Sequence, residues 1–89
     1  MKLTLANNES IEIERLNNSV TDTKTQIDIT IEQLVDINEI KTLFTGNTET
    51  ITLEKDDNST VVFKGYEKIS LVSRDISDFA DVIRITLTK

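Results

Sequence analysis

The chain has 89 residues, which is enough for one domain over residues 1–89 and too few for two. It contains no cysteine and no histidine, so it lacks a disulfide framework, a thiol nucleophile and the commonest general base and transition-metal ligand. The net charge is −6 and no basic stripe is present, which argues against direct binding to nucleic acid or to an anionic membrane.

The first ten residues are too few and too polar for a signal peptide, and no apolar run is long enough to span a bilayer. The hydrophobic share of 37% and the charged share of 29% are those of an ordinary globular protein. We therefore expect an intracellular domain that is not secreted through a signal peptide.

Most of the chain alternates apolar, often β-branched residues with polar ones, and this period of two predicts strands with one apolar face. The expected strands are Lys2–Leu5, Ser10–Arg15, Lys24–Ile31, Thr48–Lys55, Thr60–Lys64, Lys68–Arg74 and Asp81–Lys89. The residues expected on the apolar face are Leu3, Leu5, Ile11, Ile13, Ile27, Ile29, Ile31, Ile51, Leu53, Val61, Phe63, Ile69, Leu71, Ile83, Ile85 and Leu87.

Two short polar segments, Ala6–Glu9 and Asp56–Ser59, separate consecutive expected strands. Asn and Asp tolerate the left-handed backbone conformation and hydrogen-bond to their own main chain, so both segments predict hairpin turns. Gly65 follows another expected strand, where we interpret it as a β-bulge that re-aims the chain.

One helix is expected between the strands, around Asp36–Phe44. Asp36 and Glu39 have the spacing of a capping box, and Gly46 is placed to end the helix in the left-handed conformation. Apolar residues follow the helical spacing of three to four, namely Leu34, Ile37, Ile40, Leu43 and Phe44.

These elements predict an α+β fold that is mostly antiparallel β, with six to seven short strands and one short helix covering the apolar face of the sheet. One curved sheet, two packed sheets and a small closed barrel all agree with the pattern.

The strongest candidate for chemistry is the acidic run Glu54–Asn58. A calcium loop needs oxygen ligands at alternate positions and a glycine at the bend, whereas this run has adjacent acids and no glycine. Glu12 and Glu14 share one strand face, where a solvated surface explains them better than a catalytic pair. We therefore expect no catalytic residue, no metal site and no cofactor.

Three residues are candidates for an interaction surface. Tyr66 is the only tyrosine and follows the flexible Gly65; an anchor in an interface and a residue at the rim of the core are both open, and the rim is favoured. Ile76 and Phe79 lie between the last two expected strands, where they either tuck under the end of the sheet, which is favoured, or form an exposed apolar patch.

The order of the parts is similar to a known group of proteins. The segments that carry the likeness are Lys2–Leu5, Ile27–Ile31, Glu39–Phe44, Thr50–Leu53, Phe63–Ile69 and Val82–Leu87. In this order the chain resembles the small β-rich proteins of phages and prophages of Gram-positive bacteria, of the tail and host-contact type. The resemblance implies a non-enzymatic, virion-associated or tail-assembly protein in the host cytoplasm or the virion. It would act by contact with other virion proteins or a host protein, and could form a homo-oligomer.

The alternative function is a small acidic phage-encoded inhibitor of a host defence nuclease, of the anti-CRISPR or anti-restriction type. A net charge of −6 permits this function. The even scatter of the carboxylates disfavours it, because a nucleic-acid mimic would place them at phosphate-like spacing.

Overall fold

Two antiparallel sheets and one helix make up the fold in a computed structural model that describes Met1–Lys89. The elements are β1 (Lys2–Thr4), β2 (Ser10–Glu12), β3 (Arg15–Val20), β4 (Thr25–Ile31), β5 (Val35–Asp36), α1 (Ile37–Phe44), β6 (Thr50–Glu54), β7 (Thr60–Lys64), β8 (Lys68–Ile76) and β9 (Phe79–Thr88). The α+β class is confirmed, but the prediction of six to seven strands is wrong because there are nine.

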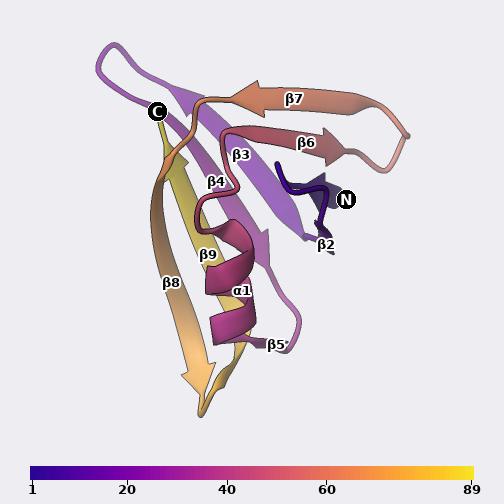
Figure 1. The fold of residues 1–89 in the computed structure, drawn as a ribbon, viewed down its shortest axis with the longest axis vertical. Helices are drawn as coiled ribbons and strands as arrows, with labels where there is room; N and C mark the ends of the chain where they lie inside the picture. The colour runs from indigo at the N-terminus through magenta and orange to yellow at the C-terminus, as the bar shows by residue number, and fades with distance from the viewer.

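The small sheet has the order β2-β1-β6-β7. The large sheet is built around β9, which pairs with β8 along one side and with β4 and then β5 along the other, while β3 pairs with β4. The small sheet and helix α1 lie on the same side of the large sheet, and the strands of the two sheets cross at a wide angle (Figure 1). Of the three arrangements left open by the sequence, the chain therefore adopts two sheets.

The chain passes from one sheet to the other within two residues. Ile13 donates its backbone N–H to Met1 in the small sheet, and Glu14 donates to Thr30 in the large sheet. The single strand expected over Ser10–Arg15 is therefore divided between β2 and β3. The sequence did not predict β3 because its residues, RLNNSV, do not alternate, and as an edge strand β3 has little to bury.

One core lies between the two sheets and under the helix. Its members are Leu3, Leu5, Ile13, Ile27, Ile29, Ile31, Ile37, Ile40, Phe44, Ile51, Leu53, Tyr66, Ala80, Ile83, Ile85 and Leu87. Full burial of each large aliphatic side chain contributes about 1.5–3 kcal/mol. Ile69 pairs with the buried Leu87 and so lies on the apolar face as expected, but it remains 39% exposed because β8 is an edge strand.

Helix α1 begins and ends as the sequence indicates. The Asp36 carboxylate accepts the backbone N–H groups of Asn38 at 2.8 Å and Glu39 at 3.2 Å, which satisfies two of the free donors of the first turn. Gly46 has a φ of +76°, so the left-handed ending is confirmed. Leu34 was assigned to the apolar face of the helix, but it precedes the first turn and is exposed.

The two predicted hairpin turns are confirmed and have the same geometry. Asn8 and Asn58 both have a φ of 68° and both donate to the residue three positions earlier. Gly65 also has a positive φ, of +84°, but it lies beyond β7 in the link to the large sheet and not in a bulge. The bulge lies instead where the register of β8 and β9 shifts between Arg74 and Asp75.

Replacing Gly46 with Ala is expected to lower the free energy of unfolding by about 1 kcal/mol. The loss comes from the left-handed backbone conformation at this position, which a residue with a Cβ atom adopts at a cost. A Cβ atom at this position meets nothing within 4 Å, so no steric term is added. Urea unfolding at neutral pH measures the change. Gly46→Asn is the matched control and should cost less, since Asn tolerates this conformation; equal losses for both would contradict the assignment.

Candidate functional site

The acidic run that invited a metal or catalytic interpretation forms the turn between β6 and β7. The Asp57 carboxylate accepts the hydroxyl of Ser59 at 2.5 Å and its backbone N–H at 3.0 Å, and these bonds hold the pKa of Asp57 below its ordinary value. Asp56 lies 3.2 Å from the N-terminal ammonium group of Met1. Nowhere in residues 1–89 do three His, Cys, Asp or Glu side chains gather closely enough to hold a metal ion.

Tyr66 lies in the core and is only 4% exposed, so its ring does not form part of the surface. The ring packs edge-on against Phe63 with 6.0 Å between the centroids, and the Lys89 ammonium group lies 5.3 Å from its centre. These contacts fix the link between the small sheet and the last strand. Of the two interpretations left open, the favoured one, a residue of the core, describes the position of Tyr66, and the ring is too buried to be an anchor at the surface.

Ile76 and Phe79 flank the two-residue turn between β8 and β9 and are 56% and 45% exposed. The favoured expectation that they tuck under the sheet is wrong, because β8 and β9 continue out to this turn and carry both side chains away from the core. The alternative, an exposed apolar patch, describes their position. Phe79 pairs with Asp36 of β5, which places it at one end of the groove described next.

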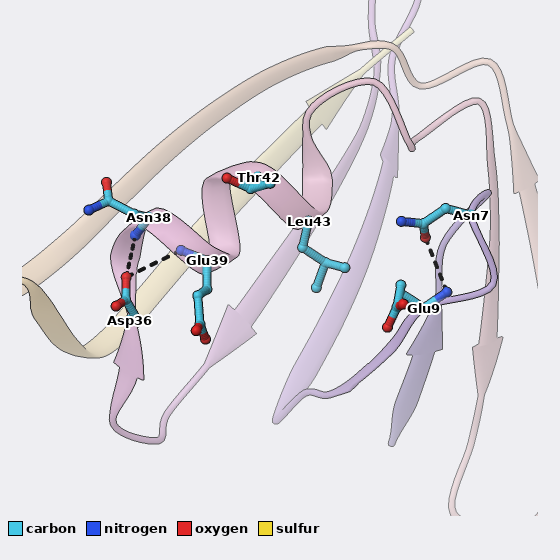
Figure 2. Close-up of a pocket in the computed structure, with 7 residues that line it drawn as sticks. All are labelled: Asn7, Glu9, Asp36, Asn38, Glu39, Thr42 and Leu43. Carbon is cyan, nitrogen blue, oxygen red and sulfur yellow. Dashed lines mark hydrogen bonds between the residues drawn. The ribbon is translucent and has the colours of Figure 1, made fainter.

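A groove runs between helix α1 and the β1–β2 hairpin. It consists of two adjoining hollows of about 440 and 600 Å³, which share Asp36, Glu39 and Leu43. In Figure 2 Leu43 projects from the helix towards the turn that carries Asn7 and Glu9. We call this the helix groove; its lining residues are Asn7, Glu9, Ser10, Ile11, Gln33, Leu34, Val35, Asp36, Asn38, Glu39, Ile40, Thr42, Leu43 and Phe79.

The larger hollow of the helix groove is mostly apolar, the smaller hollow has one hydrophobic lining residue, Leu43, and the charged residues of both are acidic. Six of the ten residues around the larger hollow are hydrophobic, and Leu34 among them is 65% exposed. The only charged lining residues are Glu9, Asp36 and Glu39, and no Lys or Arg is among them. An apolar surface with uncompensated negative charge attracts a ligand that is both apolar and cationic.

Hydrogen bonds hold the two sides of the helix groove together at both ends. Beyond the helix C-terminus, the Asn47 carbonyl accepts the backbone N–H of Ala6 in the β1–β2 turn at 3.0 Å. At the other end, the Gln33 side-chain amide donates to the Glu12 carbonyl of β2 at 3.3 Å. The width of the groove is therefore set before any ligand arrives, which lowers the entropic cost of binding.

A competing hollow on the outer face of the large sheet has polar lining residues only, namely Arg15, Asn17, Asp28, Thr30 and Arg84. Two of its charged groups, Asp28 and Arg15, already have partners within the chain. Asp28 accepts from Gln26 and Thr86, and Arg15 lies 3.5 Å from the Glu32 carboxylate. The helix groove is thus the better candidate site.

The helix groove was not among the sites expected from the sequence. Its nearest signal was the wide apolar stripe of the helix, because Ile37, Ile40 and Phe44 face the core while Leu43 lies to one side. The opposite wall comes from a hairpin about 30 residues earlier, and no local pattern joins the two segments.

Comparisons with known proteins add no assignment: the chain matches no protein-family model, no curated protein and no solved structure. None of its helices has the length and apolar character needed to cross a membrane.

One ion pair braces the turn that carries Ile76 and Phe79, and it makes a pH dependence testable. Arg74 donates to both Asp81 carboxylate oxygens, at 2.8 and 2.7 Å, and these bonds hold the pKa of Asp81 below its ordinary value. Because the pKa is lowered by folding, the stabilisation is present above the pKa of an unfolded aspartate, roughly 4, and is lost as the pH falls through the lower folded value.

We expect Asp81→Asn to lose less stability than the wild type between pH 7 and pH 2.5, because the variant has no carboxylate to protonate here. The measurement is the urea midpoint at both pH values. Asp75→Asn removes a nearby carboxylate that is not part of the Arg74–Asp81 pair, and it is the control for loss of a charge. The same acid response in Asp81→Asn and the wild type would contradict the role of this pair.

Proposed function

We propose that this protein is a non-enzymatic protein-interaction module that binds a segment of a partner protein in the helix groove. The observation that carries the proposal is the groove itself, which has a mostly apolar larger hollow, three acidic side chains and no Lys or Arg. Removing exposed apolar surface from water stabilises a complex by roughly 25 cal/mol for each Å² buried, so the exposed apolar side chains of the groove favour contact with another protein.

Both functions expected from the sequence act through protein–protein contact, and the groove supports what they share. The narrower proposal is a virion-associated or tail-assembly protein, with an inhibitor of a host defence nuclease as the alternative. The partner, a virion protein or a host protein, and the location in a bacterial cytoplasm or a virion follow from the resemblance and are proposed on that ground alone.

Selection from a random peptide library against the immobilised protein tests the proposed site. We expect peptides whose binding falls about 10-fold or more in Leu34→Asp, because one buried leucine contributes about 1.5–3 kcal/mol. Leu34 is 65% exposed, so this change spares the core.

Val72→Asp is the matched control, since Val72 is 68% exposed on edge strand β8, outside the groove. Its peptide affinity should equal that of the wild type, as measured by fluorescence anisotropy. Peptides that lose affinity in Val72→Asp and keep it in Leu34→Asp would move the site to the β8 edge. A selection that enriches no peptide would overturn the module itself.

A further inference from the structure

We propose that the helix groove takes an extended segment of a different protein, with apolar residues between Lys or Arg residues, and that this segment adds as a strand to the free edge of β2. The inference rests on the proposed function and deepens it. It goes beyond a docking site by naming the backbone that the ligand pairs with and the chemistry of its side chains.

Strand β2 is an edge of the small sheet, with β1 on one side and no strand on the other. The bonds that flank the pairing, from Leu5 to Glu9 and from Ile13 to Met1, show which register positions face β1. In an antiparallel pair these positions alternate. Ile11 therefore bonds to β1, while the N–H and C=O groups of Ser10 and Glu12 point to the free side.

The Gln33 amide already bonds to the Glu12 carbonyl on this side, at 3.3 Å. Ser10, which lines the groove, keeps both of its free-side backbone groups available. An exposed sheet edge presents unpaired N–H and C=O groups to which an extended segment can add as a strand, and at this edge the groups of Ser10 are the open ones. The proposed strand therefore pairs at Ser10 and ends near Gln33.

Side chains of an added strand alternate between two faces. One face of the added strand would lie against the apolar lining of the larger hollow, to which the helix side of the groove contributes Leu34, Ile40 and Leu43. Because main-chain pairing is limited to Ser10, the interface is small, and we expect a Kd on the order of micromolar or weaker.

The charge at the rim selects cationic flanks. Glu9 and Glu39 line opposite walls, and neither takes part in any of the ion pairs of the fold. Asp36 is bonded to the helix N-terminus but adds to the same negative potential. A second copy of this chain fits poorly, because each copy has a net charge of −6. The occupant is therefore a segment of another protein.

The test uses two acetylated synthetic peptides, KVTVTVR and its acidic counterpart EVTVTVE, titrated into the full-length protein and followed by amide NMR. The basic peptide should bind at least 10-fold more tightly, and its affinity should fall as salt rises. The Ser10 amide should become protected from hydrogen exchange, while the Ile11 amide, which already bonds to β1, serves as an internal control. Equal affinity of the two peptides, or an unchanged Ser10 amide, would overturn the inference.

Two variants separate charge from fold. Glu9→Gln and Glu39→Gln should each weaken the basic peptide about two- to fivefold, the size of an exposed ion pair, and the double variant about tenfold. Glu67→Gln, at an exposed acid outside the groove, should leave the affinity unchanged.

The result also distinguishes this inference from the proposed function. If library peptides bind at Leu34 but neither synthetic peptide shifts Ser10, the groove binds protein in another way and only strand addition fails. Light scattering tests whether a second copy of this chain occupies the groove. A wild-type dimer that Leu34→Asp converts to a monomer would place a second copy there and overturn the inference.

Discussion

The fold depends on the register between β4 and β9. Three residues of β4 lie opposite three of β9 and all six are fully buried, namely Ile27 with Leu87, Ile29 with Ile85 and Ile31 with Ile83. A slip of one residue would turn all of them to the polar face, so the apolar pattern specifies this pairing strongly. Because the pairing joins a strand from the first third of the chain to the last strand, the large sheet is complete only when β9 is in place.

The helix groove follows from how the remaining elements attach to this sheet. The corner at Ile13 and Glu14 sends the chain from one sheet to the other, which leaves β2 short and open on one side. Helix α1 covers the rest of the buried face (Figure 1), and its start is fixed by the Ile37 N–H, which donates to Asp78 at 3.1 Å. The free edge of β2 and helix α1 therefore lie next to each other at the surface, with apolar residues between them. This juxtaposition forms the groove in which we propose that a partner segment binds.

Of the three residues proposed from the sequence as an interaction surface, only Phe79 lines the helix groove. Ile76 and Phe79 were singled out because an apolar pair between two strands must be either buried or exposed, and the length of β8 and β9 decides for exposure. Tyr66 was singled out as the only tyrosine, but the turn at Gly65 points it into the core beside Phe63. The groove itself joins Glu9 and Glu39, which no local pattern relates.

The sequence by itself determined the features that depend on neighbouring residues in the chain. Period-two alternation specified most strands and the inward Ile and Leu residues, Asp36 and Gly46 specified the helix ends, and the Asn-containing turns specified two hairpins. Only the tertiary structure decided the division into two sheets, the polar edge strand β3 and the site. Sheet assignment and edge position depend on contacts between distant segments, and these leave no period in the chain that could be read in advance.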